Sequence, residues 1–219
     1  MIFRNRQEAG RSLAWRLQEC AGRDDVVVLG VPRGGIPVAF EIAEALRAPL
    51  DVFIVRKLGI PGREEVALGA IASGGVRVFD RRILRALAID LSELERIIAE
   101  AEQELKRREL TYRGVGLPVP VAGRTVILVD DGVATGASLL AAIRALRQLR
   151  PARIILAVPV APPEVRNELS REVDEMVCVA TPKPFRAVGQ FYDEFSQVRD
   201  SEVIALLSRN RQKQSKSAA

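Results

Sequence analysis

The segment Val126–Ser138, with the sequence VILVDDGVATGAS, constrains the fold of this chain more than any other. Its first four residues are apolar and mostly β-branched, which predicts a buried strand. Asp130 and Asp131 follow at the carboxyl end of that strand, and a short run of small residues then leads into a helix. The apolar residues of that helix are Leu139, Leu140, Ile143, Leu146 and Leu149. A strand, a loop and a helix in this order are typical of open α/β sheets, which bind ligands at the carboxyl ends of their strands.

The loop that follows the two aspartates suits a phosphate group. Backbone amides at the start of a helix are unpaired and carry partial positive charge. Gly136 allows a ligand to approach the backbone closely, and the hydroxyl groups of Thr135 and Ser138 add donors. Carboxylates suit sugar hydroxyl groups and Mg2+. A plain structural corner with incidental aspartates is the alternative, but the flanking strand and helix favour a site for a phosphorylated sugar.

Apolar segments alternate with helical segments along most of the chain. Strands are expected at 26–31, 50–57, 126–129, 153–160 and 174–180, and helices at 5–21, 36–47, 163–172 and after Ser138. This alternation predicts an α/β fold with three layers, α/β/α, around a mostly parallel sheet of about five to six strands. Between the first two and the last three strands, residues 66–79 predict a hairpin. A helix over 92–112 is expected to begin with a capping box formed by Ser92 and Glu95.

The composition excludes several classes of site. Histidine is absent, which rules out Ser-His-Asp catalysis, Cys-His catalysis and histidine-based zinc sites. Cys20 and Cys178 lie in apolar surroundings and are expected to be free, buried thiols of a cytoplasmic protein. The apolar runs are too short to span a membrane, and the first residues lack a secretory signal, so no membrane partner is expected. The net charge of +5 is compatible with nucleic acid and equally with a polyanionic small substrate.

Two further groups of cationic residues are expected at the same edge of the sheet. The strand 26–31 runs into the loop 32–35, where Arg33 precedes two glycines and is a bidentate donor for phosphate. The next predicted strand ends in Arg56 and Lys57, which would face the same polyanion. A solvated arginine in an ordinary turn and a charged surface loop are the alternatives. A polyanion bound between the strand ends would explain all of these residues together.

Three segments together resemble the type I phosphoribosyltransferases. They are GVPRGGIPVA (30–39), VRKLGIPG (55–62), which is similar to the adenine phosphoribosyltransferase subgroup, and the segment 126–138. With FRNRQEAGRSLA near the start, the chain is similar over residues 1–208 to a group of standalone bacterial proteins described as predicted phosphoribosyltransferases. The resemblance implies Mg2+-dependent transfer of a 5-phosphoribosyl group from phosphoribosyl diphosphate (PRPP) to a nitrogenous base, with release of pyrophosphate.

The resemblance also assigns roles to individual residues. Arg33, Arg56 and Lys57 would stabilise the leaving pyrophosphate, while Asp130 and Asp131 would hold the ribose hydroxyl groups and orient hydrated Mg2+. The residues that it assigns to PRPP binding are Gly34, Gly35, Asp130, Asp131, Gly132, Val133, Ala134, Thr135, Gly136, Ala137 and Ser138.

The aromatic segment 181–195 is similar to the hood that covers the base in purine phosphoribosyltransferases. By position, Phe185 would stack on the base, backbone groups around Val188 and Gly189 would read its edge, and Asp193 would touch the metal. A loop held down by aromatic packing is the alternative.

These assignments describe one phosphoribosyltransferase-like domain over residues 1–208. Its expected parts are a core at about 24–59 and 124–180, a lid or insertion at about 60–123 with a short helix at 80–88, and a hood from about 1–20 and 181–200. The basic tail 209–219 is expected to be disordered. We also expect a homodimer, although no sequence pattern specifies its interface.

The acceptor base is left open by the sequence. The phosphoribosyltransferases that act on 6-oxopurines carry an aspartate at the position of Ala134 in this chain. That aspartate exchanges a proton with the base. Hypoxanthine and guanine are therefore disfavoured as acceptors. Glu64 and Glu65, in the expected lid with its possible hinges at Gly59 and Gly62, are the nearest candidates for proton transfer. A PRPP-sensing regulator or nucleic-acid-binding protein on the same fold is the alternative function.

Overall fold

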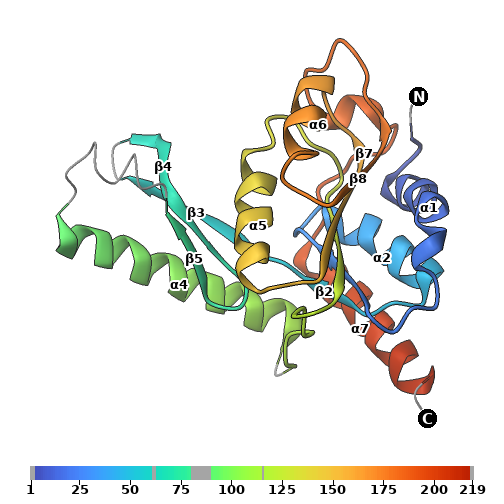
Figure 1. The fold of residues 1–219 in the computed structure, drawn as a ribbon, viewed down its shortest axis with the longest axis horizontal. Helices are drawn as coiled ribbons and strands as arrows, with labels where there is room; N and C mark the ends of the chain where they lie inside the picture. The colour runs from blue at the N-terminus through green and yellow to red at the C-terminus, as the bar shows by residue number, and fades with distance from the viewer. Residues whose placement is uncertain (1–2, 61–62, 80–89, 115, 218–219) are drawn as a thin grey trace.

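A computed structural model describes residues 3–60, 63–79, 90–114 and 116–217 (Figure 1). Its core is a five-stranded sheet with the order β2-β1-β6-β7-β8, in which all neighbouring strands are parallel. The strands are β1 (Val26–Gly30), β2 (Leu50–Val52), β6 (Thr125–Val129), β7 (Arg153–Val160) and β8 (Glu175–Ala180). The prediction of a mostly parallel sheet with five to six strands is confirmed.

Helices cover both faces of this sheet, as a parallel sheet of apolar strands requires. Alternate residues of β1 and β6 pack to opposite sides: Val28 and Ile127 join one core, and Leu29 and Leu128 join the other. The helices on the first side are α1 (Arg6–Arg16), α2 (Gly35–Leu46) and α7 (Asp200–Ser217), and those on the second are α5 (Ala137–Gln148) and α6 (Pro163–Leu169). The three-layer prediction is confirmed.

The strand order reverses between β1 and β6. From β1 the chain passes through α2 to β2 at one edge, whereas from β6 it passes through α5 and β7 to β8 at the other edge. The loops that leave β1 and β6 therefore lead toward opposite edges of the sheet, and open α/β sheets bind ligands at such a reversal of strand order. These are the loops predicted to bind phosphate.

The chain leaves the parallel sheet earlier than predicted. Residues 50–57 are not one strand, because β2 ends at Val52 and β3 (Val55–Ile60) belongs to a separate antiparallel sheet. Ser73 fixes the break: its backbone N–H donates to Ile54 O (2.9 Å), and its Oγ accepts from Ile54 N (3.1 Å). The expectation that Arg56 and Lys57 end a core strand is therefore wrong, and the insertion begins near residue 55.

The insertion consists of a three-stranded sheet and a long helix, and it extends away from the core in Figure 1. β4 (Arg63–Ala72) pairs with β3 and with β5 (Val76–Phe79), which confirms the hairpin. α4 (Leu91–Arg113) follows, with Asp90 as its N-cap residue, so the predicted capping box is wrong. The apolar stripe of α4 contacts β3 and β4 and joins the buried cluster that contains Leu58, Leu68 and Ile71. Its residues are Leu94, Ile97, Ala101 and Leu105. The predicted helix at 80–88 and the hinge glycine Gly62 lie outside the described residues.

The two segments expected to form the hood do meet. Phe3 and Tyr192 form a parallel bridge, and Phe3 N donates to Phe191 O at 2.8 Å. The 3-10 helices η1 (Gln18–Cys20) and η2 (Val188–Phe191) complete these segments. Cys20 is buried as expected, and Leu13 and Leu17 are buried too, but Trp15 of the same predicted helix is 78% exposed. It lies on the outer side of α1, where the neighbouring residues are also polar and exposed.

Both cysteines are free, as expected, with Cys20 buried and Cys178 half-buried. Burial raises the pKa of each thiol, so neither is poised as a thiolate. None of the helices in the described segments is long and apolar enough to cross a bilayer.

The basic tail is helical, not disordered, in the described structure. α7 continues to Ser217, although the expectation placed disorder from residue 209. The cause is Asn210, which is 1% exposed: its Oδ1 accepts from Leu50 N at 2.9 Å, and its Nδ2 donates to Ala48 O at 3.2 Å. Asn210 thereby satisfies backbone groups at the edge of the sheet and anchors the end of α7.

Replacing Asn210 with alanine should lower the free energy of unfolding by about 1–3 kcal/mol, because the N–H of Leu50 would stay buried without a partner. Urea unfolding followed by circular dichroism measures this loss. The matched control is Asn167→Ala on the exposed face of α6, where the change should stay within about 0.5 kcal/mol. Equal stability of both variants would show that Asn210 does not anchor the tail.

Candidate active site

The loops that leave β1 and β6 are in direct contact. Val31 N donates to Val129 O at 2.8 Å, and the peptide bond between Pro32 and Arg33 is cis. A Cβ atom on Gly34 would lie 2.0 Å from Asp131 Oδ2, and a Cβ on Gly35 would lie 2.7 Å from Val129 O. Only glycine allows this approach at residues 34 and 35. The loop 32–35 thus contacts the aspartates.

Asp130 and Asp131 lie side by side in a largely enclosed position. Asp130 Oδ1 accepts from the backbone N–H of Asp131 at 2.9 Å. Burial raises the pKa of Asp130 well above its usual value, and the neighbouring charge of Asp131 adds to this effect. Burial also raises the pKa of Asp131, while Arg6 opposes that rise. Two repelling carboxylates held in a low-dielectric position are typical of a site that receives a cation or hydroxyl groups.

Arg6 is the partner of Asp131 that the sequence did not reveal. Its Nε donates to Asp131 Oδ2 at 2.8 Å, its Nη1 donates to Ser196 O at 2.8 Å, and its guanidinium group lies 3.9 Å from the centre of the Phe195 ring. Tyr192 adds a hydrogen bond from its hydroxyl group to Asp131 O at 2.6 Å. The sequence predicts both segments as parts of the site, but no pattern in it links residue 6 to residue 131. The hood thus fixes the second aspartate.

The loop 132–136 leads from the aspartates to α5. Gly132 and Gly136 have φ angles of 153° and 77°, and a Cβ on Gly132 would lie 2.5 Å from Val188 Cγ1. Gly136 is the N-cap residue of α5 and provides no side-chain cap. Ala134, Thr135, Ala137 and Ser138 are exposed, while Val133 is buried and donates its N–H to Val160 O. Four residues around the start of α5 are therefore exposed to solvent, which is where a phosphate site at a helix N-terminus is expected.

The cationic residues divide into two groups. Arg33 is exposed on the loop next to Gly34. Arg56 and Lys57 are exposed on β3, and no contact within the described segments joins them to Arg33 or to the aspartates. Glu64 and Glu65 belong to β4, and their side chains fall outside the described ones. The structure therefore places Arg33, but not Arg56 and Lys57, at the predicted loop cluster.

The predicted base-binding residues lie on the hood side. Phe185 packs on Phe191, with ring centres 4.8 Å apart, and is half-buried. Val188 lies against Gly132, directly beside the aspartates. Asp193 is exposed, and in the described part of the chain it does not form a three-carboxylate cluster with Asp130 and Asp131. Val188 is therefore the hood residue closest to the aspartates among the three.

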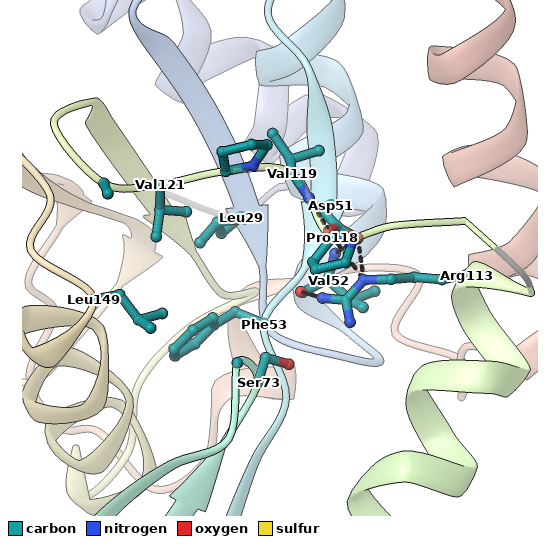
Figure 2. A pocket seen from close by; sticks show the side chains of 13 residues that line it. Leu29, Asp51, Val52, Phe53, Ser73, Arg113, Pro118, Val119, Val121 and Leu149 are labelled. Carbon is teal, nitrogen blue, oxygen red and sulfur yellow. Dashed lines mark hydrogen bonds and ion pairs between the residues drawn. The ribbon is translucent and has the colours of Figure 1, made fainter.

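A cavity of about 370 Å³ lies apart from the two loops of the candidate site (Figure 2). Its lining is mostly apolar and includes Phe53, Val121 and Leu149. Figure 2 shows Arg113 and Asp51 joined at its edge. None of its lining residues belongs to the loops 32–35 or 130–138, so this cavity is separate from the candidate site.

The chain is similar to known proteins in sequence and in fold. The family model described as a phosphoribosyl transferase domain matches residues 2–195. A protein of Mycobacterium tuberculosis strain H37Rv, named as a phosphoribosyl transferase, is 45% identical over 208 residues, which are 95% of this chain and 47% of that protein. The chain thus spans about half the length of this relative.

A solved structure and a more distant relative are also similar to this chain. The crystal structure of the protein TT1426 from Thermus thermophilus has a TM-score of 0.85 and 45% identity, covering 95% of this chain and 99% of that one. The bifunctional protein PyrR of Chloroflexus aurantiacus is 32% identical over 58% of this chain and 66% of its own length. With the family match extending from α1 through the hood, this chain belongs to the phosphoribosyl transferase family.

Proposed function

We propose that this protein transfers a 5-phosphoribosyl group between PRPP and a nitrogenous base and releases pyrophosphate. The observation that carries the proposal is the contact between Gly34 and Asp131, which brings an arginine-bearing loop and two carboxylates together where the strand order reverses. A pyrophosphate and a ribose phosphate need these groups side by side.

Different residues of the chain would bind the phosphate, the ribose and the pyrophosphate of PRPP. The exposed amides and hydroxyl groups of Thr135–Ser138 bind the 5-phosphate and fix the ribose in position. Asp130 and Asp131 accept hydrogen bonds from the ribose hydroxyl groups. Arg33 stabilises the negative charge that develops on the leaving pyrophosphate. Arg56 and Lys57 would join it only if β3 moved toward the loop.

Mg2+ fits the two aspartates as a partner. Oxygen ligands are the ones that Mg2+ prefers, and a cation would relieve the repulsion between two buried carboxylates. Because the described residues contain no group of three metal-ligating side chains, the remaining ligands would be PRPP oxygens and water. When bound, Mg2+ supplies charge neutralisation at the pyrophosphate. We assign Asp193 at most an outer position.

The base would lie against the hood. Val188 adjoins the aspartates across Gly132, and the ring of Phe185 adds an apolar surface. Ala134 is exposed and has no titratable group, so it cannot exchange a proton with a 6-oxopurine. We therefore expect acceptors other than hypoxanthine and guanine.

An acceptor panel tests the proposal. Purified protein is incubated with PRPP and Mg2+ and with individual purines, pyrimidines and related heterocycles, and pyrophosphate release is measured. We expect at least one base to raise the rate above the rate without acceptor, and EDTA to remove the increase. A protein that binds PRPP but releases no pyrophosphate with any base would refute the transferase activity.

Replacing Gly34 with alanine should weaken binding of PRPP and Mg2+ about tenfold or more, or about 1.4 kcal/mol. The added methyl group would displace the Asp131 carboxylate, which Arg6 holds at 2.8 Å. Isothermal titration calorimetry measures the affinity. Gly22→Ala is the matched control for affinity, because a Cβ there meets no described atom within 4 Å and Gly22 lies before β1, away from the loops after β1 and β6. Unchanged affinity in folded Gly34→Ala protein would mean that the position of Asp131 is unimportant.

A PRPP-sensing regulator that binds nucleic acid is the second candidate. The basic tail was its main support, but in α7 Arg211 donates to Arg113 O, and Lys213 pairs with Glu44. The ion pair between Lys213 and Glu44 reduces the positive charge available to a polyanion. Binding to nucleic acid at low salt that weakens steeply with added salt and changes with PRPP would support the regulator.

A further inference from the structure

A pocket of about 270 Å³ lies beside Arg33 and is built from three parts of the chain. The loop after β1 contributes Pro32 and Arg33, and α7 contributes Asp200. α4 supplies the remaining lining residues, which are Arg107, Arg108, Thr111 and Tyr112. Three guanidinium groups thus face one carboxylate in a polar pocket that includes the arginine next to Gly34.

The two arginines of α4 are held in place by one carboxylate. Arg107 donates from Nε and Nη2 to Glu104 at 2.7 and 2.8 Å, and Arg108 donates from Nε to Glu104 at 2.8 Å. Hydrogen bonds from both arginines lower the pKa of Glu104 to about 2, so the clamp persists at neutral pH. The remaining terminal nitrogens of both guanidinium groups have no partner in the described part of the chain. The side chains of Arg107 and Arg108 are 64% and 46% exposed, so these nitrogens are open to a ligand, and guanidinium groups suit phosphate oxygens.

The wall of the pocket is also fixed. Tyr112 is 6% exposed, and its hydroxyl group donates to Asp200 Oδ1 at 2.8 Å. This bond joins the end of α4 to the start of α7 and uses one oxygen of the single lining carboxylate. The end of α4 that carries Arg107 and Arg108 is therefore held against the start of α7.

We propose that this pocket binds a pyrophosphate group, with Arg107 and Arg108 as binding residues that act together with Arg33. The inference deepens the proposed function, on which it rests, because pyrophosphate is the product that leaves past Arg33. Two linked phosphate groups present enough oxygens to contact several guanidinium groups at once, whereas a single phosphate cannot span them as well. Because salt screens the attraction between the guanidinium groups and the pyrophosphate, binding should weaken with added salt.

The experiment uses the full chain and two ligands, pyrophosphate and PRPP with Mg2+, each titrated by calorimetry. In the double variant R107Q/R108Q the affinity for pyrophosphate should fall about tenfold or more. Arg96→Gln is the matched control, because Arg96 also pairs with a glutamate of α4 but lies about 16 Å away along the helix. Inorganic phosphate serves as the single-phosphate probe. Circular dichroism and thermal unfolding check that all variants fold.

The outcomes separate this inference from the proposed function. Loss of pyrophosphate affinity in R107Q/R108Q but not in Arg96→Gln supports the pocket. If PRPP displaces the bound pyrophosphate, the pocket binds the diphosphate group of PRPP. Simultaneous binding of both ligands would identify a free diphosphate instead. Equal pyrophosphate affinity in all folded variants overturns the inference, even if PRPP binds. If pyrophosphate binds through these arginines and PRPP does not bind at all, the result supports the pyrophosphate pocket and refutes the transferase function.

Discussion

Replacing Arg113 with methionine should lower the free energy of unfolding by about 3–5 kcal/mol, since it leaves a buried carboxylate without its partner. Arg113 and Asp51 are 8% and 1% exposed. Arg113 Nε donates to both oxygens of Asp51, at 2.9 and 3.0 Å, and its Nη2 donates to Val52 O at 2.8 Å. Figure 2 shows this pair beside the apolar cavity. Such a loss would be a large part of the stability of an ordinary domain.

The position of the pair explains why the loss should be large. Asp51 belongs to β2, Arg113 ends α4, and Asp51 also accepts from the backbone N–H of Val119 in the connection that returns to β6. Arg211 of α7 donates to Arg113 O. The pair therefore joins the insertion, the core sheet and the last helix. Its loss should loosen α4, and with it the pocket that contains Arg107 and Arg108.

Urea unfolding measures the prediction for Arg113→Met. Arg77→Gln is the matched control, because Arg77 pairs with Glu102 on α4 while about half exposed, and surface pairs contribute about 1 kcal/mol or less. A double variant with Asp51→Asn should recover part of the loss by removing the unpaired charge. A loss below about 1 kcal/mol in Arg113→Met would show that water or another group compensates Asp51.

The sequence predicted those parts of the site that depend on local patterns. Val126–Val129 is continuous and apolar, and the small residues after Asp131 mark the loop, so both the strand and the phosphate loop were predictable. The same holds for the glycines at 34 and 35. In each case the residues that determine the structure lie within about ten positions of one another, where periodicity and turn chemistry are informative.

The errors arose where contacts join residues far apart in the sequence. No glycine or proline marks the break after Val52, because Ser73 makes it from about twenty positions away. The tail looked disordered by composition, yet Asn210 bonds to Leu50 across 160 positions. Arg6 reaches Asp131 across 125 positions. Composition and periodicity contain no information on such pairs, so the two cations of β3 were misplaced and the partner of Asp131 was missed.

Replacing Asp130 and Asp131 together with asparagine should weaken binding of PRPP and Mg2+ about 100-fold or more. Hydrogen bonds to charged groups contribute about 1.5–3 kcal/mol each, and the variant loses two carboxylates that would accept from ribose hydroxyl groups and orient the metal. Saturating PRPP should raise the melting temperature of the wild-type protein but not that of the variant. Asp24→Asn, an exposed aspartate before the start of β1, is the matched control.

The single variant Asp130→Asn separates binding from folding. Because burial raises the pKa of Asp130 in the folded state, the ionised carboxylate destabilises the fold, and this cost appears as the pH rises above the unfolded pKa. Asparagine cannot ionise, so the melting temperature at neutral pH should equal or exceed that of the wild-type protein while PRPP affinity falls. A lower melting temperature together with retained PRPP affinity would show that Asp130 supports the fold and not the ligand. A residue that costs stability in the free protein and is needed for the ligand has the signature of a functional site.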